Sequence, residues 1–289
     1  MRKVLITGGS GFVGGNIVKA ASCDWDVYST FKNHPFAFPG VRTIHMNLED
    51  ADEIRDVIKE ASPDVVIHCA ASSDLDVCEE NSDQTYRINT EASGVIAELG
   101  RERGFRLIYI STDMVFDGKN GDYKESDECC PINTYGKSKL EAEKIVSDIC
   151  TNFVIARAAL VYGRPLTGGT SFSQRIIETT GEGREMYLFM DQYRTPVLVQ
   201  DLARAVIELS ESEFTGIIHL GGSERCDRYS FGLRLAEIRG ISKKMLRPIS
   251  MNDVQFVAPR PRDTSFNISF ARSLLNTELT GWREGLKRA

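Results

Sequence analysis

A tyrosine and a lysine four residues apart, Tyr135 and Lys139, have the side chains needed to transfer a proton to a carbonyl oxygen. The surrounding stretch, Thr134–Ile149, predicts a helix, so both side chains share one face. A free tyrosine has a pKa of about 10, and a neighbouring ammonium stabilises the phenolate and lowers that pKa. Such a pair can protonate the alkoxide that develops when a ketone is reduced. The same spacing is also common on exposed helix faces, so the pair indicates a catalytic site only if a second feature supports it.

That second feature is a run of polar side chains after the apolar stretch Arg106–Ile110. Ser111, Thr112 and Asp113 follow this predicted strand, at the edge where parallel sheets bind ligands. A hydroxyl there can hold a substrate carbonyl beside Tyr135. In the alternative interpretation, Ser111 and Thr112 only cap the strand.

A glycine-rich loop, Thr7–Gly14, joins the first predicted strand to the first predicted helix. Gly8 permits a tight turn, Gly11 lets the backbone approach a pyrophosphate, and Gly14 allows the helix to pack closely on the strand. The N–H groups at the start of the helix would face the phosphates. A glycine turn without a ligand is the alternative. The predicted cofactor contacts in this loop are Gly8, Ser10, Gly11, Phe12, Val13 and Gly14.

The end of the second predicted strand bears on which nicotinamide cofactor would bind. An acidic residue there would bind the ribose 2′-hydroxyl of NAD, but Tyr28-Ser29-Thr30-Phe31-Lys32 contains no carboxylate. Lys32 is therefore the candidate for the 2′-phosphate of NADP, unless it is only solvated surface. The sequence favours NADP(H) and leaves NAD(H) open.

Short apolar runs alternate with amphipathic stretches over the first half of the chain, which predicts a doubly wound parallel α/β sheet of the Rossmann type. The predicted strands are Val4–Ile6, Asp26–Thr30, Val41–Met46, Asp64–Cys69, Arg106–Ile110, Phe153–Ala156 and Gly216–Leu220. The predicted helices are Phe12–Ala21, Ala51–Ala61, Asn89–Arg103, Thr134–Ile149, Ser171–Thr180, one within Pro196–Leu209, and Ser230–Arg239, with a polar tail after them. We expect a dinucleotide-binding domain at residues 1–160, to which residues 196–220 return. Residues 161–195 and 221–289 are expected to form a smaller substrate-binding lobe.

Composition excludes several classes of function. The 289 residues carry a net charge of −6 without a basic, aromatic-rich run, which argues against nucleic acid as a partner. The first apolar stretch is too short for a signal sequence or a membrane span. Seven scattered cysteines without a CxxC pair favour free thiols in the cytoplasm. Cys129-Cys130 is either a redox pair or two ordinary thiols. The four histidines lack the spacing of metal ligands, so no metal site is expected.

Three motifs together resemble the extended short-chain dehydrogenase/reductase family, and within it the dTDP-4-dehydrorhamnose reductase branch. They are the glycine loop, the stretch Ser-Thr-Asp-x-Val-Phe-Asp-Gly at residues 111–118, and the set Pro131, Tyr135, Lys139 and Glu143. Residues 194–196, 201–203 and 260–262 match the branch more loosely. The resemblance implies that Tyr135 is the general acid and Lys139 tunes it and binds the nicotinamide ribose. It also implies that Thr112 holds the carbonyl and Asp113 assists the hydroxyl network or contacts the sugar.

The same resemblance implies further contacts. Asn47, Leu48, Ala70 and Ala71 would contact the cofactor, and Arg157, Arg194 and Arg260 would contact the substrate. Asn89 also matches a family position and is interpreted as structural. Met114 departs from the branch, which usually has tyrosine there, and Asn47 replaces an aspartate.

We therefore expect a reductase of a nucleotide-linked 4-keto-6-deoxysugar. An epimerase or dehydratase that uses its cofactor catalytically, and a non-catalytic NADP-binding regulatory subunit, are the alternatives. The family also suggests a homodimer that pairs through the helices Asn89–Arg103 and Tyr135–Ile149. The nucleotide, the sugar and the product stereochemistry are not readable from the sequence.

Overall fold

Seven parallel strands form the central sheet of the protein, whose computed structural model describes residues 1–289. In space the strands follow the order β3-β2-β1-β4-β5-β6-β11, so the order reverses direction between β1 and β4. The bounds are β1 Lys3–Thr7, β2 Asp26–Phe31, β3 Val41–His45, β4 Val65–His68, β5 Arg106–Thr112, β6 Phe153–Ala158 and β11 Gly216–Leu220. This arrangement confirms the predicted doubly wound α/β class, and its ligand crevice is expected at the reversal.

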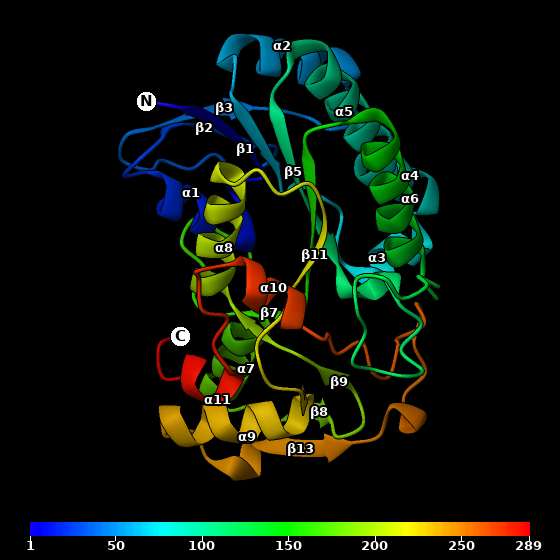
Figure 1. Ribbon diagram of the computed structural model, residues 1–289. Helices are drawn as coiled ribbons and strands as arrows, with labels where there is room; N and C mark the ends of the chain where they lie inside the picture. Colours follow the sequence, from blue (N-terminus) through cyan, green and yellow to red (C-terminus); the bar gives the residue numbers. More distant parts are fainter.

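Helices cover both faces of the sheet (Figure 1). On one face, α1 (Phe12–Ala21) packs against α8 (Val199–Glu211). On the other lie α2 (Ala51–Ala61), α5 (Ala92–Arg103) and α6 (Thr134–Ile149). Because both faces are covered, the strands between them read as continuous apolar runs rather than as alternating patterns.

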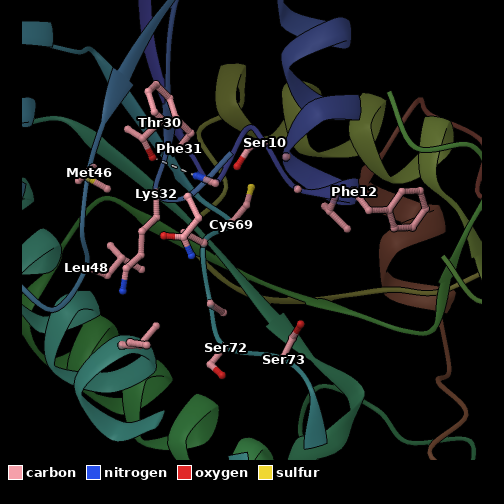
Figure 2. Close-up of a pocket in the computed structure, with 18 of the residues that line it drawn as sticks. Ser10, Phe12, Thr30, Phe31, Lys32, Met46, Leu48, Cys69, Ser72 and Ser73 are labelled. Carbon is pink, nitrogen blue, oxygen red and sulfur yellow. Dashed lines mark hydrogen bonds between the residues drawn. The ribbon is translucent and has the colours of Figure 1, made fainter. Parts of the chain in front are cut away.

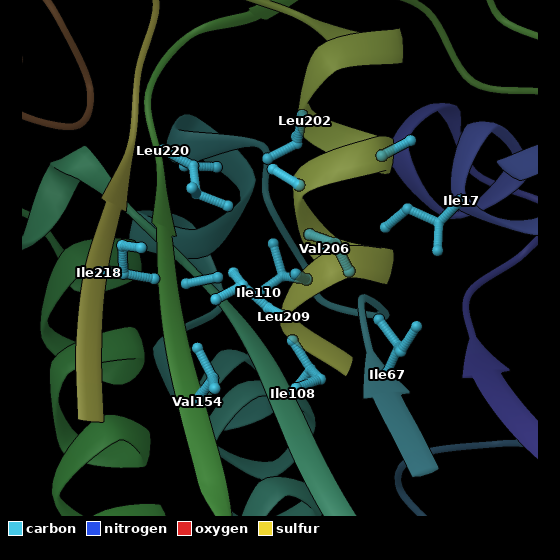
Figure 3. Packing of buried hydrophobic residues seen from close by; sticks show 14 of the residues in the cluster. Ile17, Ile67, Ile108, Ile110, Val154, Leu202, Val206, Leu209, Ile218 and Leu220 are labelled. Atoms are coloured by element: carbon cyan, nitrogen blue, oxygen red, sulfur yellow. The ribbon is translucent and has the colours of Figure 1, made fainter. Parts of the chain in front are cut away.

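The core under α1 and α8 shows how these segments, far apart in the sequence, are held together (Figure 3). Ile17 of α1 and Leu202 and Val206 of α8 are fully buried against strand residues such as Ile67 and Ile108. Burial of each such side chain contributes about 1.5–3 kcal/mol relative to its exposure. This packing fixes the start of α1, and with it the glycine loop.

A smaller lobe lies below the sheet in Figure 1. It contains α7 (Phe172–Gly181) and α9 (Arg228–Arg239), together with a parallel pair of strands, β8 (Met186–Phe189) and β13 (Leu246–Ile249). Its core includes Tyr162, Phe172, Phe231 and Trp282. The remaining short elements are β7 Val161–Tyr162, β9 Tyr193–Arg194, β10 Val197–Leu198, β12 Cys226–Asp227, α10 Ser269–Leu274 and α11 Trp282–Gly285.

The structure differs from the sequence prediction before α5. Two short helices, α3 (Leu75–Glu80) and α4 (Ser82–Tyr86), and a π-helical turn at Arg87–Glu91 precede it. Asp74 begins α3 by accepting two backbone N–H groups, which is a normal helix start. The π-helical turn contains Asn89, whose amide bonds the backbone of Ser72 and the hydroxyl of Ser138. Asn89 is therefore a structural residue. No helix in the structure is both long enough and apolar enough to cross a membrane.

Candidate active site and cofactor cleft

A cleft of about 530 Å³ opens at the reversal of the sheet, along the glycine loop and the ends of β2 and β4 (Figure 2). Its lining contains most of the predicted cofactor contacts. They are Gly8, Ser10, Gly11, Phe12, Val13, Gly14, Lys32, Leu48, Ala70 and Ala71, joined by Thr30, Phe31, Asn33, Met46, Cys69, Ser72, Ser73, Ile88 and Thr170.

The glycine-rich loop Thr7–Gly14 lines the cleft and is called the cradle below. Its geometry requires glycine at two positions. Gly8 has a φ of +70°, and a Cβ added there would lie 2.9 Å from the Cα of Ala70. A Cβ on Gly14 would lie 2.2 Å from the carbonyl oxygen of Gly8. No real Cβ tolerates such contacts, so only glycine lets the loop lie this close to β4 and α1.

The start of α1 is open toward a ligand. Gly11 is its N-cap and supplies no side-chain hydrogen bond, and the first turn contains no acidic residue. The first N–H groups of the helix therefore lack a side-chain partner, and together with the helix dipole they favour an anion. The cradle and the uncapped helix fit the pyrophosphate of a dinucleotide.

The opposite end of the cleft lies at Lys32 and Leu48 (Figure 2). The Lys32 ammonium is 2.7 Å from a carboxylate oxygen of Glu49. Asn47 accepts the N–H of Glu49 with its side-chain oxygen at 3.2 Å and is absent from the cleft lining. Asn47 thus shapes the loop, while Leu48 and Met46 supply an apolar wall.

A buried network behind the cleft holds Ala70. The Thr7 hydroxyl accepts the N–H groups of Cys69 and Ala70, each at 3.1 Å, and lies 2.7 Å from Nδ1 of His68. Nε2 of His68 lies 3.2 Å from the Ser93 hydroxyl. Burial lowers the pKa of His68 to about 3, so this ring is neutral and structural rather than catalytic.

Tyr135, Lys139 and Thr112 do not themselves line the cleft. Lys139 lies near Cys69, which does line it, and Tyr135 lies beside Thr112. Burial raises the pKa of Tyr135 well above its ordinary value, and a hydrogen bond with Thr112 opposes that rise. Lys139 is almost completely buried, with Nζ 4.0 Å from the ring centroid of Tyr109. Burial lowers the pKa of Lys139 to about 7, although the nearby Glu143 carboxylate raises it. The spacing of the two residues predicts that Lys139 lowers the pKa of Tyr135, whereas in the structure burial has the largest effect on the pKa of both residues.

A buried ion pair supports the catalytic helix from behind. Glu143 lies one turn after Lys139 and accepts three hydrogen bonds from Arg157, at 2.7, 3.0 and 3.2 Å. Ser111 donates to the same carboxylate at 2.5 Å. Arg157 and Glu143 are each only 3% exposed. The sequence predicts that Arg157 contacts the substrate. In the structure its guanidinium instead binds the Glu143 carboxylate.

Asp113 and Arg194 also form an internal link. Nε of Arg194 lies 3.1 Å from the Asp113 carboxylate, and Thr264 donates to the same oxygen at 2.6 Å. A second guanidinium nitrogen donates to the carbonyl of Pro261 at 3.1 Å. Arg194 is 1% exposed. Its guanidinium therefore links the end of β5 to the 260–264 loop and is not open to a substrate. Asp113 is held in the same way.

Arg260 keeps a free donor. One terminal nitrogen bonds Asp76 of α3 at 2.8 Å, and the other is buried without a hydrogen-bond partner within the chain. A buried unpaired guanidinium nitrogen is costly, so a ligand acceptor is the physical expectation.

Arg228, at the start of α9, is a further cation that no sequence motif marks. Its Nε donates to Gln192 at 3.0 Å and its guanidinium carbon lies 4.5 Å from the Phe172 ring centroid, but no carboxylate pairs with it. Burial, followed by the charge of Arg194, lowers the pKa of Arg228 to about 9. An arginine outside any recognised motif carries no signal in a single sequence, so only the structure could identify it.

A dinucleotide cleft with a tyrosine and a buried lysine one helical turn apart beside it is the arrangement of the short-chain dehydrogenase/reductases, and this chain is an NAD(P)-dependent oxidoreductase of that class. More narrowly, it belongs to the family defined by the RmlD substrate binding domain, whose model matches residues 1–289.

Individual relatives agree with this membership. The dTDP-4-dehydrorhamnose reductase of Bacillus anthracis, solved in complex with NADP, superimposes with a TM-score of 0.89 at 26% identity, covering 100% of this chain and 98% of that one. The probable low-salt glycan biosynthesis reductase of Haloferax volcanii is 33% identical over 78% of this chain and 76% of its own. The methionine adenosyltransferase 2 subunit beta of Danio rerio is 30% identical over 99% of this chain and 89% of its own.

Proposed function

We propose that this protein reduces the keto group of a nucleotide-linked 4-keto-6-deoxysugar with NADPH as the favoured donor and NADH as the alternative. The observation that carries the proposal is the placement of Tyr135, beside Thr112 and one helical turn before the buried Lys139, near a cleft shaped for a dinucleotide. Similarity to dTDP-4-dehydrorhamnose reductases and to a glycan biosynthesis reductase supports this substrate class.

Thr112, Tyr135 and Lys139 have distinct roles in the proposed reduction. A bound nicotinamide dinucleotide would supply the hydride. Thr112 orients the substrate carbonyl, and Tyr135 gives its proton to the oxygen as negative charge develops there. The raised pKa of Tyr135 keeps the phenol protonated until that moment. Lys139, in its charged form, then stabilises the phenolate and binds the cofactor ribose.

Two arginines are suited to an anionic part of the substrate. Arg228 has no carboxylate partner, and Arg260 has a buried terminal nitrogen without one. Arginine matches phosphate oxygens with its fork of N–H donors. We assign both to the diphosphate that links nucleotide and sugar. Arg157, Arg194 and Asp113 position these groups through the internal contacts described above.

Tyr135→Phe tests the proposal. Oxidation of NADPH and NADH is followed by absorbance against a panel of nucleotide-linked 4-keto-6-deoxysugars. Loss of the Tyr135 phenol should cut turnover by about 10²-fold or more, within the range for one general acid, while the cofactor Kd changes little. Retained turnover in Tyr135→Phe would refute the assignment. Tyr187→Phe, an exposed tyrosine in the smaller lobe, is the matched control.

A regulatory subunit is the second candidate function. Its support is the 30% identity to a methionine adenosyltransferase subunit over nearly the whole chain. A protein that binds cofactor but oxidises it with no sugar in the panel would favour this candidate. An epimerase or dehydratase would instead retain cofactor through purification and convert sugar without net oxidation.

A further inference from the structure

The cofactor cleft ends in an ion pair. Lys32, which lines the cleft after β2, lies 2.7 Å from the carboxylate of Glu49, which follows β3. The Lys32 side chain is 41% exposed and the Glu49 side chain 21%. The ammonium that would bind a ribose 2′-phosphate therefore already has an anionic partner.

Glu49 is held in place by groups from several segments. Its other oxygen accepts a hydrogen bond from Gln84 of α4 at 3.1 Å, and Nε of Arg87 lies 3.9 Å away in the π-helical turn. Hydrogen bonds from Lys32 and then from Gln84 lower the pKa of Glu49. The carboxylate is thus ionised at neutral pH and fixed beside the cleft.

These contacts have opposite consequences for the two cofactors. A 2′-phosphate must compete with Glu49 for Lys32 and is repelled by its carboxylate. A 2′-hydroxyl can donate a hydrogen bond to a carboxylate, the role that an acidic residue at the end of β2 has in NAD-binding folds. β2 ends without a carboxylate, and the loop after β3 offers one, that of Glu49, against the cleft residue Lys32.

We propose that Glu49 sets the choice between NADP(H) and NAD(H), by occupying Lys32 and by offering a carboxylate to the ribose. The inference rests on the proposed function only in that the cleft binds a nicotinamide dinucleotide. With Glu49 present, the protein accepts both cofactors with a modest preference, and without its charge the preference for NADPH rises.

The test compares dissociation constants of NADPH and NADH, measured by nicotinamide fluorescence on the full chain, for wild type, Glu49→Gln, Lys32→Met and the double variant. Glu49→Gln should tighten NADPH about fivefold, the upper range for an exposed charge pair, and leave NADH equal or weaker. In the Lys32→Met background the effect on NADPH should be smaller than in wild type, because the competition for Lys32 is gone and only the repulsion by Glu49 remains. Glu53→Gln, which loses an exposed pair with His45 nearby, should change neither constant.

Equal effects of Glu49→Gln on both cofactors, or weaker NADPH binding, would overturn the role of Glu49. A normal thermal unfolding curve for the variant confirms that it is folded. If wild type binds neither cofactor, the proposed function fails and this inference fails with it. If wild type binds both with a ratio that Glu49→Gln does not change, only this inference fails.

Discussion

Glu143→Gln should move the pH dependence of catalysis, because Glu143 acts on Lys139 without touching substrate. Glutamine removes the negative charge and keeps one acceptor oxygen, which can still accept from Ser111 and from Nε of Arg157, while the acceptor for the terminal nitrogen of Arg157 is lost. Lys139 must be charged to stabilise the Tyr135 phenolate, so activity should fall as pH rises through the pKa of Lys139, about 7 in the free protein. Removing an anion disfavours the ammonium, which shifts this fall to lower pH.

The size of the shift follows from the geometry. Side chains four residues apart on a helix are separated by roughly 6 Å, and at an effective dielectric constant of about 20 a unit charge at that distance is worth ~3 kcal/mol. Arg157, which lies 2.7 Å from the Glu143 carboxylate, cancels most of this at Lys139. We take about one third as the remainder, ~1 kcal/mol or ~0.7 of a pKa unit.

The assay is kcat/KM from pH 5.5 to 9 with the sugar that the panel identifies, together with the NADPH dissociation constant over the same range. Glu141→Gln, on the exposed side of the same helix, is the control and should leave the profile in place. An alkaline limb that stays within 0.2 units of wild type, or moves to higher pH, would refute the electrostatic role of Glu143.

Three further predictions concern the cradle, the core and the substrate site. Gly14→Ala should weaken NADPH binding more than tenfold and destabilise the fold by about 1–3 kcal/mol, because its Cβ would meet a backbone oxygen at 2.2 Å. The control is Gly181→Ala, whose added Cβ faces open space. It should change neither the NADPH dissociation constant nor the free energy of unfolding. Burial lowers the pKa of His68 and of His219 to about 3. Both rings stay neutral in the folded chain while the unfolded chain protonates them below its pKa of about 6.5. The free energy of unfolding in urea should therefore fall by up to ~1.4 kcal/mol per pH unit for each histidine between about pH 6.5 and 5, and a flat profile would contradict this. Arg228→Gln should raise KM for the nucleotide sugar about tenfold or more without changing the NADPH dissociation constant, and an unchanged KM would remove Arg228 from the substrate site.

The sequence alone determined the elements that carry strong local patterns. Helices Phe12–Ala21, Ala51–Ala61 and Thr134–Ile149 have the predicted bounds because apolar periodicity and short-range start signals act within each segment. Strands buried on both faces read as apolar runs for the same reason. The glycine loop was predictable because a strand-to-helix junction that binds a pyrophosphate needs glycine for the tight turn, for the approach of the phosphate and for close packing of the helix.

Local pattern did not predict the short strands of the smaller lobe or the helices α3 and α4. Two-residue strands such as Val197–Leu198 exist only because a distant partner supplies their hydrogen bonds, so no periodicity marks them. The turn at Asn89 likewise depends on Ser72 and Ser138, which are distant in sequence.

The chemistry divides in the same way. The residue types Tyr135, Lys139 and Thr112 and their spacing define a proton-transfer site in the sequence. Only the tertiary structure decides that burial, rather than the Lys139 charge, dominates the pKa of Tyr135. The tertiary structure also decides that Arg157 forms an ion pair with Glu143, and that Glu49 forms one with Lys32. Charge and burial at a site depend on which distant groups the fold brings within a few ångströms, and a single sequence does not contain those distances.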